Sequence, residues 1–345
     1  MLRPGDVPPS QDDLAVIGVF NPGVIALADG VVLLVRVAEQ PSEKRSGQTA
    51  LPRWDIGTGR IVFDWLPEEQ TEPVDIRVVR LKDTGLVRLN FTSHLRVVRS
   101  RDGRTIDSID QTFFRPATIY EEYGVEDPRI TRFGDTCFIT YVAVSRHGVT
   151  TALASTRDFV TFDRPGILFP PENKDVVLFP EKIGGEYFAL HRPTAATAFS
   201  RPEMWIASSP DRLNWGRHEH LLGSAARWDL GRVGAGAPPI RTERGWLEIY
   251  HGNSRRAADL DIGAYSGGAL LLDGQNPRRV LGAAGRILCP ELEFEREGYI
   301  PNVVFPTGVV ERGETLLVYY GAADTVTAVV ELSRREILEA IRPVI

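Results

Sequence analysis

A short pattern recurs five times along the 345-residue chain and constrains its fold more than any other feature. In each copy a proline leads into an apolar run, and a glycine turn and a second apolar run follow. The glycine comes five to eight residues after the proline in the pairs Pro22 and Gly30, Pro128 and Gly134, Pro180 and Gly185, Pro239 and Gly245, and Pro306 and Gly313. Because glycine permits the backbone angles of a tight turn, each copy is typical of a β-hairpin.

A second element recurs out of phase with the hairpins. The segments RSRDG (99–103), STRDFVTF (155–162) and SSPDRLNW (208–215) resemble one polar turn, with aspartates at 102, 158 and 211. Their intervals of 56 and 53 residues suit one four-stranded sheet per repeat. The sequence therefore predicts a five-bladed β-propeller. A β-sandwich whose hairpins are alike by chance is the alternative.

Short runs rich in β-branched and aromatic residues, such as VVLLVRV (31–37) and CFITYVAV (137–144), favour strands over helices. We expect an all-β fold and one domain over residues 1–345. A polar N-terminal tail is predicted over 1–14 and a short C-terminal helix over 333–341, with Ser333 as its candidate cap.

Composition excludes several classes of function. The formal net charge of −6 and the pI near 5.7 give no overall basic field for nucleic acid or an anionic membrane. The N-terminus lacks the apolar core of a signal peptide, and no apolar stretch approaches the roughly 18 residues of a membrane span. Cys137 and Cys289 lie far apart in apolar segments, which predicts buried thiols and a cytoplasmic protein.

In a propeller, residues near the start of each innermost strand reach the central axis at one mouth, and so do the ends of the paired strands. The repeat therefore predicts that the following residues converge: Asn21, Asp127, Asp175, Phe179, Pro238, Phe305, Arg36, Tyr141, His191, Arg192, Tyr250, His251 and Tyr320. Few of them are acidic, and several are of types that bind sugars or anions.

The segment YEEYGVEDPRIT (120–131) concentrates carboxylates. Glu121 and Glu122 are expected to be solvated, and Pro128 is expected to hold Asp127 in an extended conformation. A carboxyl group at a channel mouth among aromatic residues can act as a general acid. Capping of a turn by Asp127, or pairing with Arg129, is an equally open alternative.

The segment from Pro171 to Pro193 places Lys174, His191 and Arg192 at the ends of adjacent strands, where they could bind one phosphate or carboxylate. A surface lysine and a core histidine are the plainer alternative. Asp324 follows the last hairpin and could bind sugar hydroxyls or cap a turn. The histidines lack metal-site spacing, so no metal is expected.

The motifs GVEDPRIT, KDVVLFPEKI, HRP, GAGAPPI, GWLEIYHG, VVFPTG and YYGAADT resemble, in this order, the signature of glycoside hydrolase family 130. The resemblance runs from about Asn21 to Thr325. It implies a five-bladed propeller and a β-mannoside phosphorylase, in which phosphate attacks the anomeric carbon and gives α-mannose 1-phosphate with inversion. Asp127 matches the family's general acid, whose proton passes through a sugar hydroxyl.

The resemblance also implies binding residues. Those matching the substrate site are Asn21, Glu126, Asp324, Tyr250 and His251. Those matching the phosphate site are Arg146, Lys174, His191 and Arg192, with Tyr250 and Arg96 as further candidates. No cofactor is expected, because inorganic phosphate is a co-substrate.

Two other functions stay open. A β-mannosidase of the same fold would need a carboxylate base, for which Glu291, Glu293 and Glu297 are candidates. A non-catalytic carbohydrate-binding propeller is less compatible with the intact Glu-Asp-Pro-Arg motif. Loops 38–60 and 253–264 are expected at the pocket rim, where they would set linkage and acceptor. The sequence leaves homo-oligomerisation open.

Overall fold

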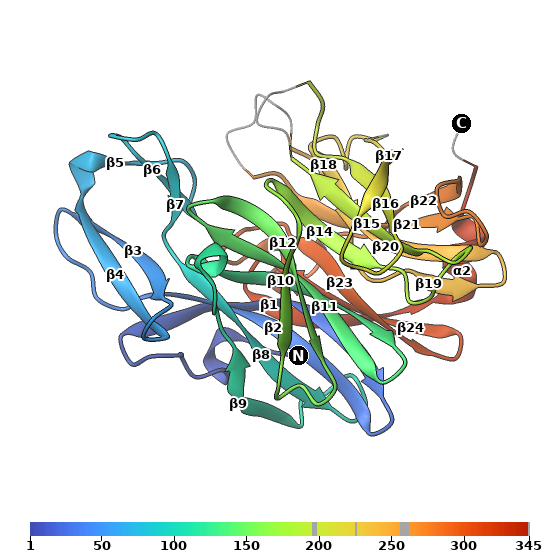
Figure 1. Cartoon of the computed structure of the whole chain (residues 1–345), viewed down its shortest axis with the longest axis horizontal. Coiled ribbons are helices and arrows are strands. Elements are labelled where there is room, and N and C mark those ends of the chain that lie inside the picture. Colours follow the sequence, from blue (N-terminus) through green and yellow to red (C-terminus); the bar gives the residue numbers. More distant parts are fainter. Residues whose placement is uncertain (195–198, 225, 256–261, 344–345) are drawn as a thin grey trace.

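The computed structural model describes residues 1–194, 199–224, 226–255 and 262–343, and within them the fold is all-β. Each of the five predicted hairpins begins a separate sheet (Figure 1). The first sheet contains, in order, β1 (Leu14–Leu27), β2 (Gly30–Pro41), β8 (Thr92–Ser100) and β9 (Ser108–Phe114), and the second contains β10 (Gly124–Phe133), β11 (Thr136–Ser145), β12 (Gly148–Thr156) and β13 (Asp163–Phe169). The third contains β14 (Asn173–Leu178), β15 (Tyr187–Pro193), β16 (Met204–Ser209) and β17 (Gly216–Leu222). The fourth contains β18 (Arg232–Ala235), β20 (Gly245–Asn253), β21 (Tyr265–Leu272) and β22 (Val280–Leu288), with β19 (Ile240–Thr242) paired to β20. The fifth contains β23 (Val304–Arg312), β24 (Thr315–Ala322) and β25 (Val326–Ser333).

The five repeat glycines take the backbone angles that the pattern predicts. Their φ values all lie in the region that favours glycine: +145° at Gly30, +60° at Gly134, +88° at Gly185, +135° at Gly245 and +63° at Gly313. At Gly245 the space is also closed, because a Cβ there would lie 2.1 Å from the Leu272 carbonyl oxygen. The hairpins therefore depend on glycine at these turns.

The aspartate turns connect the third and fourth strands of successive sheets. Asp102 Oδ1 accepts the backbone N–H groups of residues 104 and 105, and Asp158 and Asp211 repeat this pattern with residues two and three positions later. Asp273 makes the same turn between β21 and β22, a fourth copy that the sequence pattern had not revealed. Local hydrogen bonding explains why aspartate recurs here.

Both chain ends pack on the sheets. The predicted N-terminal tail is not free: Leu2 is buried and pairs with Thr327 on the outer edge of β25. The predicted C-terminal helix is α2 (Arg334–Ala340), where Ser333 Oγ accepts the N–H of Glu336 as its cap. A single-turn helix that was not predicted, α1 (Glu293–Arg296), precedes β23. The 3₁₀ turns are Pro4–Asp6, Glu68–Gln70 and Ile119–Glu121.

An arm of five strands is inserted between β2 and β8. It comprises the hairpin β3 (Gln48–Asp55) and β4 (Arg60–Pro67) and the three-stranded sheet β5 (Thr71–Pro73), β6 (Val78–Leu81) and β7 (Val87–Leu89). Figure 1 shows the arm projecting to one side of the five sheets. The sequence had indicated only a rim loop over 38–60.

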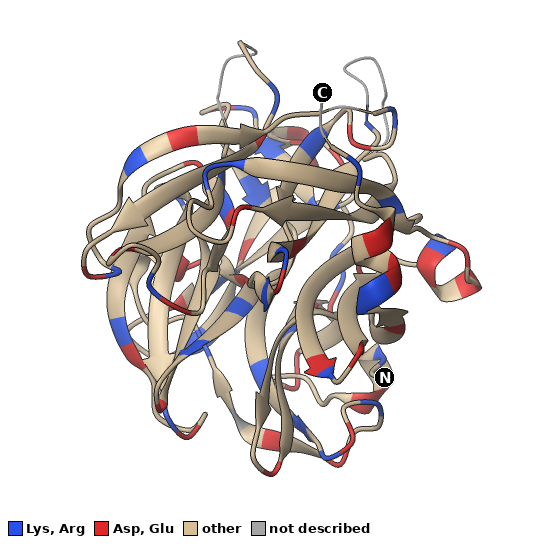
Figure 2. Cartoon of the chain, turned by 90° about the vertical axis from the view of Figure 1, so that its right-hand side faces the viewer, with Lys and Arg blue, Asp and Glu red and all other residues tan. Residues whose placement is uncertain are grey.

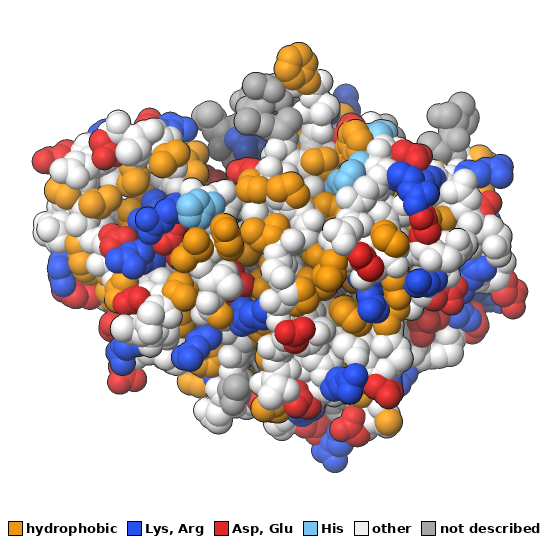
Figure 3. Space-filling view, in the orientation of Figure 1, with side chains coloured by type: hydrophobic (Ala, Val, Ile, Leu, Met, Phe, Trp, Pro, Cys, Tyr) orange, Lys and Arg blue, Asp and Glu red, His pale blue; other side chains and the backbone are white. Residues whose placement is uncertain are grey.

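In the views of Figures 2 and 3, acidic and basic residues are interspersed, and the described residues form no continuous basic patch there. Among the described residues, no helix is long and apolar enough to cross a bilayer. Cys137 is buried as predicted, whereas Cys289 is only half-buried.

Candidate active site

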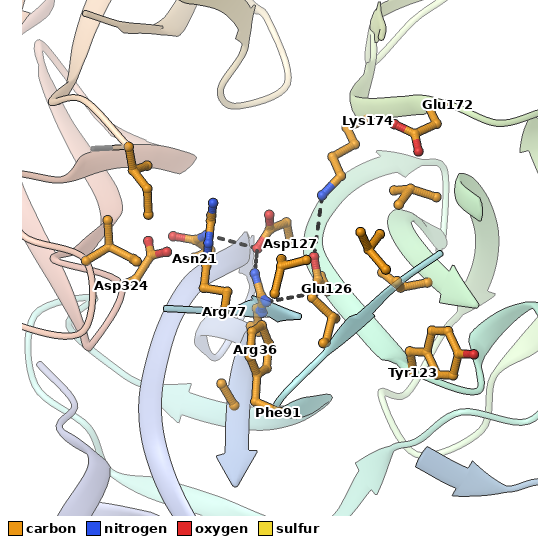
Figure 4. Close-up of a pocket in the computed structure, with 18 of the residues that line it drawn as sticks. Asn21, Arg36, Arg77, Phe91, Tyr123, Glu126, Asp127, Glu172, Lys174 and Asp324 are labelled. Atoms are coloured by element: carbon orange, nitrogen blue, oxygen red, sulfur yellow. Dashed lines mark hydrogen bonds and ion pairs between the residues drawn. The ribbon is translucent and has the colours of Figure 1, made fainter. Parts of the chain in front are cut away.

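A pocket of about 490 Å³ opens where the five sheets and the arm meet. Every sheet contributes to its wall: Asn21 and Arg36 from the first, Asp127 from the second, Lys174, Asp175 and Arg192 from the third, Arg232 from the fourth, and Phe305 and Asp324 from the fifth. Its volume lies within the range of about 300–1,000 Å³ that is typical of small-ligand sites. The pocket is therefore the candidate active site (Figure 4).

Three polar side chains reach the pocket through the same backbone device. The pairing of β1 with β2, of β10 with β11, and of β14 with β15 shifts register beside Asn21, Asp127 and Asp175. At these bulges φ is +48°, +49° and +56°. Asn and Asp tolerate this region better than most residues, and a bulge re-aims a side chain. Pro128 had suggested an extended conformation for Asp127. This prediction was wrong, because the bulge determines the backbone conformation of Asp127.

The Asp127 carboxylate is held by two donors. Asn21 Nδ2 and Arg36 Nη1 each donate to Asp127 Oδ1 over 2.9 Å. Arg129 does not pair with the carboxylate, since its Nη1 donates to the Asp127 backbone carbonyl over 2.8 Å. Burial alone would raise the pKa of Asp127, but the positive charges of Arg36 and Arg129 outweigh it and lower that pKa below its ordinary value. The open alternatives for Asp127, a turn cap or an Arg129 pair, do not describe this carboxylate.

Arg36 joins the two acids of the Glu-Asp-Pro-Arg motif. Its Nη2 donates to Glu126 Oε1 over 2.7 Å, while Nη1 holds Asp127, and Phe20 and Phe91 lie against its guanidinium. Glu126 Oε2 lies 3.7 Å from Lys174 Nζ. A continuous charge network therefore links the Asp127 side of the pocket to Lys174, as the dashed lines of Figure 4 show.

Asp324 lies on the other side of Asn21 from Lys174, next to Arg77 of the arm (Figure 4). Burial and the negative charges of Asp127 and Glu126 outweigh the attraction of Arg77 and Arg36 and raise the pKa of Asp324 to about 6. The close packing around Asn21 requires glycine opposite it: a Cβ on Gly321 would lie 1.9 Å from Asn21 Oδ1. Asn21 and Asp324 thus form one polar corner of the pocket.

Cationic groups line the Lys174 side. Arg192 Nη1 pairs with Asp175 Oδ2 at 2.8 Å, and the Arg192 and Arg232 Nε atoms are buried without a hydrogen-bond partner among the described residues. Lys174, Arg192 and Arg232 supply three cations on this side, against the two buried acids Asp175 and Glu126. Such a group of donors suits an anion with several oxygens. Among the described residues, no cluster of His, Cys, Asp and Glu could hold a metal ion.

Four residues implied by the resemblance do not face the pocket in the expected way. His191 is buried and bonds to Asn173 and His218, and burial beside His218 lowers its pKa to about 3. Tyr250 packs on Trp228, and His251 lies behind the wall, 3.3 Å from Asp175 and from Arg192 Nη1. Arg146 reaches the rim but pairs with Glu122 at 2.7 Å.

Other expected residues lie elsewhere. Arg96 is buried and donates to His94 and to two backbone carbonyls outside the pocket. Glu291, Glu293 and Glu297 do not line the pocket. Residues 256–261 of the predicted rim loop 253–264 lie outside the described residues.

Glu121 and Glu122 are buried rather than solvated. Glu121 accepts the Tyr141 hydroxyl at 2.5 Å and also pairs with Arg164. Because both carboxylates are satisfied by neighbours, they support the wall beside β11 and do not enter the site.

Sequence reasoning had missed Arg77, Arg232 and Tyr299 as pocket residues. Arg232 begins β18 two residues before the GAGAPPI motif, so its place at a strand start was a usable signal. Arg77 and Tyr299 lie outside the repeat and carried no such signal.

Comparisons with known proteins agree with this architecture. The model of glycoside hydrolase family 130, described as beta-1,4-mannooligosaccharide phosphorylase, matches residues 87–343. The β-1,2-mannobiose phosphorylase of Listeria innocua is 39% identical over 98% of this chain and 95% of that protein. A 1,2-β-oligomannan phosphorylase of a Thermoanaerobacter species is 38% identical over 72% of this chain and 81% of that protein.

The structural comparison extends over almost the whole chain. The Listeria innocua enzyme, solved with β-1,2-mannobiose, has a TM-score of 0.92, and the match covers 98% of this chain and 96% of that one. Five sheets around one polar pocket, the ordered motifs and these matches lead to one conclusion: the chain belongs to glycoside hydrolase family 130.

Proposed function

We propose that the protein is an inverting β-mannoside phosphorylase that cleaves β-1,2-mannobiose with inorganic phosphate. One observation carries the proposal: the buried Asp127 faces a cationic group made of Lys174, Arg192 and Arg232 across a single pocket. An acid on one side and an anion site on the other suit inverting displacement by phosphate. The β-1,2 linkage follows that of the Listeria and Thermoanaerobacter relatives.

Asp127 acts as the proton donor. In the resting site its pKa is low because Arg36 and Arg129 stabilise the carboxylate. A phosphate anion next to Lys174 would offset part of this positive charge, and a sugar in the pocket would remove water. Both effects favour the protonated acid. Bound substrates therefore prepare Asp127 for donation, which runs through a sugar hydroxyl to the departing oxygen.

Phosphate binds to Lys174, Arg192 and Arg232. Its oxygen forms a bond to the anomeric carbon as the glycosidic bond breaks on the opposite face, and the departing oxygen receives the proton. The buried Nε groups of Arg192 and Arg232 have no hydrogen-bond partner among the described residues, and phosphate bound against these side chains would supply acceptor oxygens. His251 holds Asp175 and Arg192 from behind, and His191 supports the same strand. Asn21, Glu126 and Asp324 surround the mannose ring.

The five sheets form the blades of a five-bladed β-propeller in this proposal. Their first strands contact one another in a ring, β1 with β10, β10 with β14, β14 with β18, and β23 with β1, while β20 and β21 contact β23. Leu2 supplies the fourth strand position of the last sheet by pairing with Thr327. Such a pairing joins the two chain ends in one blade and stabilises the ring.

A β-mannosidase needs a carboxylate that activates water. Glu172 is the pocket carboxylate best placed for this role, since it is exposed on the Lys174 side (Figure 4). The cations around it favour phosphate over a general base.

One assay separates these functions. β-1,2- and β-1,4-mannobiose are incubated with the enzyme, with and without phosphate, and free mannose is measured. We expect release only with phosphate and faster with the β-1,2 sugar. Equal release without phosphate would identify a hydrolase.

A further inference from the structure

The arm delivers one charged side chain into the pocket. Arg77 lies directly before β6, and Val78, Leu81, Leu86 and Val87 of the arm line the pocket wall with it. These residues precede or only just enter the segment 87–343 that the family model matches. The arm therefore forms one wall of the pocket.

Arg77 is fixed before any ligand binds. Its Nη2 donates to Asp75 Oδ2 over 2.9 Å, and its backbone N–H donates to Asp75 Oδ1 over 2.7 Å. The Arg77 carbonyl accepts the Asn90 N–H over 3.0 Å. Arg77 Nη1 makes no hydrogen bond to another described residue, so two donors of the guanidinium are available to the pocket.

Tyr299 ties the arm to the fifth sheet. Its hydroxyl donates to the Ile76 carbonyl over 3.0 Å, one residue before Arg77, and its ring meets the Phe91 ring edge-on. Asn90 Nδ2 donates to the same carbonyl over 2.8 Å. Since Tyr299 follows α1, the arm and the start of the fifth sheet hold Arg77 between them.

The position of Arg77 indicates what it binds. Figure 4 shows Arg77 near Asn21 and Asp324, whereas Lys174 and Glu172 point in from the opposite side of Asp127. Asp75 neutralises the guanidinium charge, so the free donors suit neutral hydroxyls better than a second phosphate. In an inverting displacement the departing sugar lies on the face opposite the phosphate.

We propose that Arg77 is a specificity-determining residue that binds hydroxyls of the departing mannose, with Asp75 and Tyr299 as positioning residues. The inference rests on the proposed phosphorylase function. It assigns recognition of the acceptor sugar to the arm and recognition of the phosphate to the sheets.

The test uses synthesis from α-mannose 1-phosphate and mannose. Arg77→Ala should raise the KM for mannose by about tenfold or more, as loss of a charge-assisted hydrogen bond predicts, and change the KM for α-mannose 1-phosphate by less than about twofold. Arg77→Lys, which keeps the charge and most of the volume, should show an intermediate KM for mannose. Arg80→Ala is the matched control, because Arg80 lies three residues further along the arm, within β6, and pairs with Glu72 at the surface.

Tyr299→Phe should raise the KM for mannose without changing the KM for α-mannose 1-phosphate, and add little to Arg77→Ala. Equal effects on both KM values in the Arg77 variants, or no effect on either, would overturn the proposal. Calorimetric binding of β-1,2-mannobiose to the wild type and to Arg77→Ala is measured in parallel. If the wild type shows no phosphate-dependent turnover, the proposed function fails, and this binding still decides the role of Arg77.

Discussion

Replacing Arg36 is expected to destabilise the folded protein strongly. It pairs with Glu126 at 2.7 Å and with Asp127 at 2.9 Å, and its side chain is 8% exposed beside carboxylates that are 6% and 10% exposed. Arg36→Met would leave two buried carboxylates without their shared cation. Removing one partner of a buried ion pair typically costs about 3–5 kcal/mol, and we expect a loss in that range near pH 8.

The loss should depend on pH. In the wild type Arg36 helps to hold the pKa of Asp127 below its unfolded value, so Asp127 stabilises the fold above the unfolded pKa and loses this effect only as the pH falls through the folded pKa. Without Arg36, burial would raise that pKa above the unfolded value. Protonation then relieves the buried charge, and the deficit should be smaller at pH 5 than at pH 8.

Chemical denaturation at pH 5 and pH 8 measures this difference. Arg45→Met is the control, since Arg45 pairs with Glu43 on the exposed surface and should leave stability unchanged at both pH values. A deficit for Arg36→Met below about 1 kcal/mol, the usual range of an exposed pair, would refute the reasoning. A deficit of equal size at both pH values would refute its electrostatic cause.

Two further predictions follow from the walls of the pocket. The pKa of Asp324 is raised from 3.8 to about 6, so the folded protein binds a proton that the unfolded chain releases, and stability falls as the pH rises from about 4 to 6. Asp324→Asn should therefore stabilise the protein at pH 8 by about 3 kcal/mol, measured by chemical denaturation, while weakening mannobiose binding. A stabilisation as large at pH 4 would contradict the assignment. Arg232→Met should raise the KM for phosphate about tenfold and leave the KM for mannobiose nearly unchanged. Arg241→Met is the control, because the Arg241 guanidinium bonds to the Gly274 carbonyl away from the pocket. An unchanged KM for phosphate would remove Arg232 from the anion site.

The repeat allowed much of the site to be predicted from sequence. Asn21, Asp127 and Asp175 occupy equivalent positions of three hairpins, so one expectation about strand starts placed all three in the pocket. The bulge that turns their side chains inward was not predictable, because positive φ at Asn or Asp has no sequence pattern as specific as a glycine turn.

Strand alternation explains the residues that were misplaced. Neighbouring residues of a strand point to opposite faces, so His191 and Arg192 could not both reach the pocket. Arg192 lines it, while His191 stacks on Phe169 between sheets. To predict which residues of a hairpin line the pocket, one must know which face of each strand points inward. On a strand that is buried on both faces, the sequence does not distinguish the inward face from the outward one.

The arm could not be derived from the repeat. Asp75 and Asn90 bond to Arg77 directly, and Tyr299, which is distant in sequence, bonds to the neighbouring Ile76 carbonyl and to Asn90. Such long-range pairings depend on the tertiary arrangement rather than on local pattern.

The central claim is that phosphate, and not water, attacks the anomeric carbon while Asp127 donates the proton. Proton and phosphorus NMR of β-1,2-mannobiose cleavage in phosphate buffer tests it directly by identifying the first product. We predict that α-mannose 1-phosphate forms in equal amount to free mannose, and that Asp127→Asn forms neither while still binding the sugar. Release of both sugar units of mannobiose as free mannose, without α-mannose 1-phosphate, would contradict this claim. Unchanged turnover in Asp127→Asn would contradict it as well.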